Sequence, residues 1–175
     1  MNHPLPPPPP FTILVDTREQ KPLPFSASIP TIRTTLKEGD YGIAGCPRFV
    51  AEKKDLADLI GTLYGHKMAA DGSKLKNLDR FCRELTRIKD GNYTRAYIIV
   101  TDPITALLAH SYRSQVSPEA VVGLIHRLED EYGIVFEFFP SAQIAAAWLA
   151  DRALKHYRRR FGLSKSNVSG KPVQK

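Results

Sequence analysis

Three acidic residues and one lysine in the first third of the chain have the types and spacing that phosphodiester hydrolysis requires. Asp16 ends an apolar run, Asp40 follows Gly39, and Glu52 precedes Lys54 by two residues. Hard cations such as Mg²⁺ prefer carboxylate oxygens, neutralise phosphoryl charge and activate water. Without a cation, converging carboxylates would repel one another and at least one pKa would rise. We therefore predict that Asp16, Asp40 and Glu52 bind a divalent metal.

Glu52 and Lys54 should lie on one face of a strand, because side chains alternate between faces with a period of two. Val50 shares this face, and Lys53 points to the other. From this position Lys54 can orient or deprotonate the attacking water, or stabilise the developing negative charge. The Glu-x-Lys pattern alone also fits a solvated, salt-bridging strand, and an Asp before a turn is common turn chemistry. The prediction rests on the order and spacing of the whole set.

Three sequence motifs in this region resemble those of a known nuclease family. VDTRE (15–19), EGDY (38–41) and AEKKDLADLI (51–60) occur here in that order. They resemble the Asp-x-Arg-Glu, Gly-Asp-Tyr and Glu-Arg-Lys motifs of the XPF/Hef structure-specific endonucleases, in which an Asp-Leu pair follows the third motif. RFCREL (80–85) and the stretch 116–138 resemble later parts of the same domain. The resemblance covers about residues 11–160.

The resemblance implies a restriction-endonuclease-like core, Mg²⁺ or Mn²⁺ as the cofactor, and cleavage of DNA near a branch or junction. It implies that Asp16, Asp40 and Glu52 bind the metal and that Lys54 is catalytic. The residues that would support this site from within the same motifs are Arg18, Glu19, Lys53 and Asp58.

Two positions depart from the family pattern. Lys53 stands where the family usually has arginine. A bidentate contact to a phosphate or carboxylate would be weaker with lysine than with arginine. Thr101 follows the apolar run AYIIV, where the family often has a glutamate. No tandem helix-hairpin-helix pattern follows residue 161 and no helicase pattern precedes residue 11. A separate protein is therefore a candidate source of specificity for a particular DNA structure.

The elements that must position these residues follow from hydrophobic periodicity and turn signals. Apolar or alternating runs predict strands at 11–17, 32–45, 47–54, 96–101 and 134–139. Apolar residues at steps of three and four, with capping and stop signals, predict helices at 55–65, 75–88, 117–133 and 141–161. Three strands followed by alternating helices and strands predict an α/β fold, a mixed sheet flanked by helices.

The length of 175 residues suits one globular domain. We predict a flexible proline-rich lead at 1–10, a nuclease domain at 11–162 and a disordered basic tail at 163–175. No apolar run reaches the roughly 20 residues that a membrane span needs, and the start lacks the pattern of a signal peptide. Cys46 and Cys82 fit neither a disulfide framework nor a zinc site. We expect a cytoplasmic protein, associated with the nucleoid when it binds DNA.

The net charge of +7 is concentrated near the C-terminus. Residues 152–175 hold eight basic residues and no acid, so the rest of the chain is close to neutral. A localised basic segment suits a phosphate-backbone partner, although a solubilising tail is the alternative. The candidate DNA-contacting residues are Arg158, Arg159 and Arg160 in this segment, with Arg80, Arg83 and Arg87 on the helix predicted at 75–88. A solvated helix face is the alternative for the second group.

These observations together predict a metal-dependent DNA endonuclease that acts on branched or otherwise structured DNA in repair or recombination. A DNA-binding module without catalysis, which recruits a partner, is the alternative from another functional class. A phage or restriction-type nuclease on the same core is a third possibility. Inactive nuclease-like domains lose their carboxylates, and this chain keeps the full set, which favours the enzyme.

The apolar residues of the two C-terminal helices predict that the chain forms a homodimer. The helices at 117–133 and 141–161 carry more apolar residues than one stripe against a sheet needs, and the excess must be buried. A second copy related by a two-fold axis would bury it, and the resemblance adds that XPF/Hef nuclease domains pair. The alternative is that both helices, Trp148 included, are simply well-buried core elements.

Overall fold

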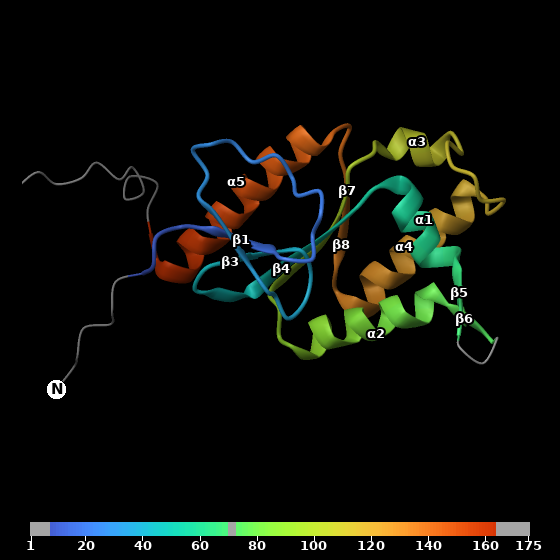
Figure 1. Ribbon diagram of the computed structural model, residues 1–175, viewed down its shortest axis with the longest axis horizontal. Coiled ribbons are helices and arrows are strands. Elements are labelled where there is room, and N and C mark those ends of the chain that lie inside the picture. The colour runs from blue at the N-terminus through green and yellow to red at the C-terminus, as the bar shows by residue number, and fades with distance from the viewer. Residues whose placement is uncertain (1–7, 70–72, 164–175) are drawn as a thin grey trace, which may run out of the picture.

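Six strands form one mixed sheet, and helices cover both of its faces (Figure 1). The computed structural model describes residues 8–69 and 73–163. In their order across the sheet, the strands are β2 (Thr31–Thr34), β1 (Ile13–Asp16), β3 (Tyr41–Ile43), β4 (Cys46–Lys54), β7 (Arg95–Val100) and β8 (Val135–Phe138). The helices are α1 (Leu56–Tyr64), α2 (Asn77–Asp90), α3 (Ile104–Leu108), α4 (Pro118–Tyr132) and α5 (Ala142–Phe161). The predicted α/β class, a mixed sheet flanked by helices, is confirmed.

Strand β4 joins the antiparallel part of the sheet to the parallel part. β3 runs antiparallel to both β1 and β4, whereas β7 runs parallel to β4 and to β8. In register, Glu52 lies beside Ile98 and Lys54 lies beside Val100. Because β4 and β7 run in the same direction, their C-terminal ends lie together, and their N-terminal ends lie together at the opposite end of the strands.

The stretch 32–45, predicted as one extended segment, instead forms two strands on opposite sides of β1. β2 pairs with β1 in parallel, and β3 pairs with it antiparallel. Between the two strands, Gly39 adopts a φ of +69°, a left-handed conformation that only glycine adopts freely. A Cβ at this position would collide with the Val50 side chain and the Ala51 carbonyl group. The turn at Gly39 places the next residue, Asp40, against β4.

Each face of the sheet has its own hydrophobic core, because side chains alternate along the strands. Phe49 and Ala51 belong to the core that includes α5. Val50 belongs to the core that includes α1, α2 and α4, and the Lys54 ammonium lies 5.4 Å from the ring centroid of Phe81 in that core. The predicted placement of Val50, Glu52 and Lys54 on one face is therefore confirmed.

Trp148 on α5 is partly buried and packs against the core that includes α5. Its ring lies edge-on to Tyr97, with 5.1 Å between the ring centroids, and also 5.1 Å from the ring centroid of Phe139. The guanidinium of Arg152 lies over its outer side, 5.2 Å from the ring centroid. These contacts support packing of Trp148 within the single chain, which is the alternative to contact with a second copy.

Two helix starts follow the predicted capping signals. The Ser117 and Ser141 side chains accept hydrogen bonds from the first turns of α4 and α5. Gly133 and Gly162 end the same helices in left-handed conformations.

The predicted start of α2 is wrong by two residues. Leu75 belongs to β6 (Lys74–Lys76), which pairs with β5 (His66–Met68) in a separate two-stranded sheet, and its side chain is exposed. An apolar residue three positions before Leu78 matches helical spacing whether or not the helix has begun, so periodicity does not mark the boundary. The short helix α3 and the β5–β6 pair have too few residues to produce a periodic signal.

Residues 8–10 of the predicted lead lie next to the end of α5. The Tyr157 hydroxyl donates a hydrogen bond to the Pro9 carbonyl, and Thr12 Oγ1 donates one to the Pro10 carbonyl at 3.2 Å. Residues 1–7 of the lead, and all of the predicted tail except Leu163, lie outside the described residues. In the described part of the chain, no helix combines the length and apolar character needed to cross a membrane.

Candidate active site

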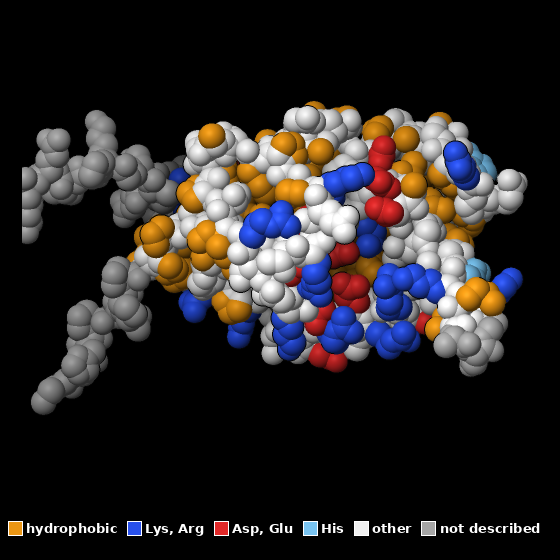
Figure 2. All heavy atoms as spheres, viewed as in Figure 1, with side chains coloured by type: hydrophobic (Ala, Val, Ile, Leu, Met, Phe, Trp, Pro, Cys, Tyr) orange, Lys and Arg blue, Asp and Glu red, His pale blue; other side chains and the backbone are white. Residues whose placement is uncertain are grey.

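A polar hollow of about 330 Å³ opens beside β4 on the side of the sheet that α1 and α2 cover. Its lining comes from the loop after β1, the turn before β3, β4, α1 and α2. The lining residues are Arg18, Lys37, Glu38, Gly39, Asp40, Glu52, Lys54, Thr62, Arg80, Phe81, Glu84 and Arg87. Figure 2 shows acidic side chains gathered at the centre of this face, with Lys and Arg side chains around them. Three of the four residues predicted to be catalytic, Asp40, Glu52 and Lys54, line this hollow.

Glu52 and Lys54 are held against each other by their shared face of β4. Lys54 Nζ donates a hydrogen bond of 3.1 Å to Glu52 Oε1. The two side chains are only 18% and 12% exposed, respectively, so solvent screens this pair weakly. A lysine ammonium has three N–H donors, and the described contacts use one of them. The remaining donors are free for a water molecule or a phosphoryl oxygen.

Asp40 is fixed to the edge of β4 by the turn at Gly39. Its backbone N–H donates to the Ala51 carbonyl at 2.9 Å, and its Oδ2 accepts from the Lys53 backbone N–H at 2.8 Å. Burial, followed by the negative charge of Glu52, raises the pKa of Asp40 to about 7. The negative charge of Glu52 therefore opposes the ionisation of Asp40, as expected beside a second ligand of one cation.

Asp16 occupies a different environment from Asp40 and Glu52. Both of its oxygens accept hydrogen bonds from Arg18, at 2.7 Å and 3.1 Å, and Oδ2 also accepts from the Leu36 backbone N–H at 2.6 Å. The hydrogen bond from the Arg18 side chain is the largest cause that lowers the pKa of Asp16 to about 2. Asp16 is buried and is not part of the lining of the hollow. In this arrangement its carboxylate anchors Arg18, which does line the hollow.

The remaining predicted supporting residues lie behind or beside the hollow. Lys53 points away from Glu52, donating to the Lys21 carbonyl at 2.7 Å and lying 3.3 Å from Glu19 Oε2. Asp58 is exposed on α1, where its backbone N–H donates to Asp55 Oδ1 at 2.8 Å. Neither Lys53, Glu19 nor Asp58 lines the hollow.

Two glutamates of the hollow carried no predicted role. Glu84 on α2 has a raised pKa, because it is buried and because the charge of Glu52 acts on it. Glu38 is buried and accepts two hydrogen bonds from Arg87, at 2.8 Å from Nε and 3.1 Å from Nη2. The spacing of Arg80, Glu84 and Arg87, at steps of four and three, places all three on one side of α2. That alternation of charges is the sequence signal by which Glu84 could have been found.

The six predicted DNA-contacting arginines fall into two separate places. Arg80 and Arg87 line the polar hollow, whereas Arg83 of the same helix is exposed outside its lining. Arg159 and Arg160 line another cavity, near the end of α5. Arg158 belongs to neither lining, and its Nε is buried without a hydrogen-bond partner among the described residues.

The residues of the hollow fit a hard divalent cation by their chemistry. Within residues 8–69 and 73–163, no three His, Cys, Asp or Glu side chains form a ready cluster of metal ligands. The donors that are present are carboxylate oxygens, which Mg²⁺ and Mn²⁺ accept. Burial, and then the negative charge of Glu52, raises the pKa of Asp40, and a cation held by both carboxylates would relieve the repulsion between them.

Comparisons with known proteins agree with this geometry. The family described as "ERCC4 domain" matches residues 15–151. The fold is similar to "XPF from Aeropyrum pernix", with a TM-score of 0.63 and 23% identity, covering 85% of this chain and 66% of that chain. It is also similar to "XPF from Aeropyrum pernix, complex with DNA", with a TM-score of 0.60 and 20% identity, covering 90% of this chain and 68% of that one. No curated protein sequence matches significantly. The chain thus spans about two thirds of the length of these solved structures.

Proposed function

The chain belongs to the ERCC4 domain family, and from this premise we propose that it is a DNA endonuclease that uses Mg²⁺ or Mn²⁺. The observation that carries the proposal is that Asp40, Glu52 and Lys54 line one polar hollow whose lining also includes arginines. The fold shared with an XPF structure solved as a complex with DNA supports DNA as the substrate.

In the proposed mechanism, Asp40 and Glu52 would hold the metal ion, which would supply polarisation of the scissile phosphate and a lowered pKa for a water molecule. Asp16 stays a predicted ligand, and its use requires that Arg18 or the Leu36 backbone N–H release one of its oxygens. Glu84 faces Glu52 from α2 and adds a further carboxylate to the same hollow.

Lys54 is the proposed catalytic lysine. Its hydrogen bond to Glu52 and the Phe81 ring fix the ammonium at the centre of the polar lining. From there its free N–H donors orient the attacking water or stabilise negative charge on the phosphoryl oxygens. Phe81 is the apolar side chain of the lining beside Lys54, and the Lys54 side chain is only 12% exposed, so the partly desolvated ammonium interacts more strongly with a phosphate.

The basic residues in the lining of the hollow are the proposed contacts to the substrate. Arg18, Lys37, Arg80 and Arg87 surround the carboxylates, and phosphate contacts of this kind position a nucleic acid without reading its sequence. We propose branched or otherwise structured DNA, in repair or recombination, as the substrate. A separate protein is the proposed source of preference for one DNA structure.

The homodimer remains part of the proposal, with less free apolar surface than the sequence suggested. Val121, Ile125 and Leu128 of α4 and Leu149 and Tyr157 of α5 are buried within the single chain. Ile144 remains half exposed, and Leu154, Val122 and Leu124 are partly exposed. This residual surface on α4 and α5 is the proposed contact with a second copy.

The experiment that tests the proposed function is cleavage of a DNA panel with Mg²⁺, Mn²⁺ or EDTA. The panel contains flap, fork, Holliday, single-stranded and plain duplex DNAs. We expect metal-dependent cleavage that the Glu52→Gln variant has lost. Metal-independent binding without cleavage of any substrate would instead support a non-catalytic DNA-binding module. Cleavage of plain duplex in preference to every branched substrate would favour a restriction-type nuclease.

A further inference from the structure

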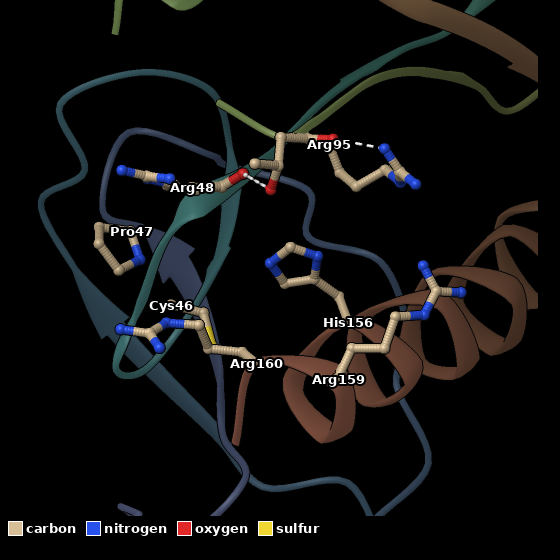
Figure 3. Close-up of a pocket in the computed structure, with 8 residues that line it drawn as sticks. Cys46, Pro47, Arg48, Arg95, His156, Arg159 and Arg160 are labelled. Carbon is tan, nitrogen blue, oxygen red and sulfur yellow. Dashed lines mark hydrogen bonds between the residues drawn. The ribbon is translucent and has the colours of Figure 1, made fainter. Parts of the chain in front are cut away.

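A second and larger cavity, of about 660 Å³, lies at the N-terminal ends of β4 and β7 (Figure 3). Its lining residues are Cys46, Pro47, Arg48, Thr94, Arg95, His156, Arg159 and Arg160. Four of these eight side chains are guanidinium groups, and none is acidic. The lining of this cavity is therefore strongly basic.

The four arginines come from three separate elements that the fold brings together. Thr94 joins two of these elements, because its backbone N–H and Oγ1 both donate to the Arg48 carbonyl, at 2.9 Å and 3.3 Å. The Thr94 carbonyl accepts from Arg95 Nη1 at 2.6 Å. In Figure 3, Arg48 and Arg160 lie on one side of the His156 ring, and Arg95 and Arg159 lie on the other.

The His156 ring lies at the centre of the cavity (Figure 3). The His156 ring packs on Phe49, with 5.4 Å between the ring centroids. Burial, and then the charges of Arg95 and Arg159, lower the pKa of His156 below its ordinary value. The positive charge of the cavity therefore comes from the arginines, which keep their charge at every physiological pH.

None of these arginines has an acidic partner in the described part of the chain. The ion pairs among residues 8–69 and 73–163 involve other residues, such as Arg18 with Asp16 and Arg87 with Glu38. Four clustered like charges repel one another unless an anion joins them. All four side chains are exposed, so an anion can reach them from solvent.

We propose that this cavity is a second DNA-binding site, which holds the sugar–phosphate backbone of one arm of the substrate away from the cleavage hollow. A single phosphate carries too little charge to neutralise four guanidinium groups, whereas a duplex presents one charge per about 1.7 Å of its axis. Arg48 and Glu52 are separated by four residues of β4, or about 13 Å along the strand. The two sites therefore engage different segments of one DNA molecule.

The proposal takes DNA as the ligand from the proposed function, but its test does not depend on cleavage. We would measure binding of a labelled fork by fluorescence anisotropy in EDTA, over a series of salt concentrations. Arg48→Gln/Arg95→Gln and Arg159→Gln/Arg160→Gln should each bind more weakly. Each pair should also reduce the slope of log K against log salt by up to about 1.8, or about 0.9 per lost phosphate contact.

Arg113→Gln/Arg127→Gln is the matched control, since it removes two exposed arginines from other parts of the surface. It should keep the wild-type salt slope. Melting curves of all three variants establish that they fold, and the two test pairs lie on different elements, so misfolding of one leaves the other informative. Wild-type affinity and slope in a folded test pair would overturn the proposal.

Small phosphate compounds share the chemistry of the DNA backbone, so their binding requires a separate experiment. Inorganic phosphate and ATP would be titrated into wild type and both test pairs, with binding followed by calorimetry. We expect wild-type DNA binding to exceed binding of either compound by at least tenfold. If the variants lose ATP or phosphate binding and keep DNA binding, the cavity is a small-anion site and the DNA assignment is wrong. Absence of cleavage by wild type with Mg²⁺ would contradict the nuclease proposal alone.

Discussion

The ammonium of Lys54 lies 3.1 Å from Oε1 of Glu52, on the same face of β4 and inside the polar hollow. This pair joins the proposed catalytic lysine to a proposed metal ligand. A change at either residue therefore alters the charge that the other experiences, and the two should be treated as one unit.

Removing either member of the Glu52–Lys54 pair should abolish most cleavage while the protein still folds. Glu52→Gln and Lys54→Ala should each lower the rate at saturating Mg²⁺ by at least about 10²-fold, the scale of a lost acid–base or charge-stabilising group. The double variant should be little worse than the worse single variant, because residues that act as a unit are not additive. Lys67→Ala, on exposed β5, is the control and should cleave normally. Wild-type rates in either single variant would show that the pair is structural.

Asp40 should make the metal-free protein less stable as the pH rises. Its folded pKa of about 7 lies above the ordinary value of 3.8, so the folded state binds the proton more tightly than the unfolded state does. The stability linked to this proton is complete below about pH 4 and is lost as the pH rises towards 7. Melting in EDTA at pH 5 and pH 8 should show a larger loss for wild type than for Asp40→Asn. Equal losses would mean that Asp40 titrates normally.

The same residue should link folding to the metal. At pH 8, Mg²⁺ should raise the melting temperature of wild type, because a ligand that binds only the folded state stabilises it. The increase should be smaller in Asp40→Asn and in Glu52→Gln. Asp58→Asn, which changes an exposed carboxylate outside the hollow, should retain the full increase.

Asp16 should show the opposite dependence on pH. Its folded pKa of about 2 lies below the ordinary 3.8, so its contribution to stability is present above about pH 4 and is lost as the pH falls towards 2. At pH 7, Asp16→Asn should reduce the free energy of unfolding by about 1–3 kcal/mol, since charge-assisted hydrogen bonds from Arg18 and Leu36 are weakened. Urea titrations at pH 7 and pH 3 measure the difference, which should shrink at pH 3. A wild-type Mg²⁺-induced rise in melting temperature in this variant would remove Asp16 from the predicted ligands.

Arg87 should have a structural role that its neighbour Arg83 lacks. Arg87→Gln leaves the buried Glu38 carboxylate without its two guanidinium hydrogen bonds, so the variant should melt at a lower temperature than wild type. Arg83→Gln removes the same charge from an exposed position of α2 and should melt normally. If both variants melt at the same temperature and only Arg87→Gln binds DNA more weakly, Arg87 contacts the substrate and has no structural role.

The sequence by itself determined the class of fold and the candidate residues for the chemistry. The alternation of side chains on a strand placed Glu52 and Lys54 together and sent Lys53 to the other face, because this depends only on local backbone geometry. Helix starts at Ser117 and Ser141 and ends at Gly133 and Gly162 are likewise local, since capping atoms lie within a few residues of the groups that they satisfy.

Only the tertiary structure decided which of these residues meet. Three carboxylates in the right order gave no means of knowing that Asp16 is held by Arg18 and Leu36 while Asp40 lies in the hollow with Glu52. Arg18 is only two residues from Asp16, but Leu36 reaches Asp16 through the pairing of β1 with β2, which no local pattern records. The charge pattern of the basic C-terminal segment likewise identified Arg159 and Arg160 as candidate DNA contacts, but it did not identify Arg48 and Arg95. Those four guanidinium groups share a cavity because β4 and β7 run in parallel and α5 crosses their N-terminal ends, and no local pattern records that arrangement.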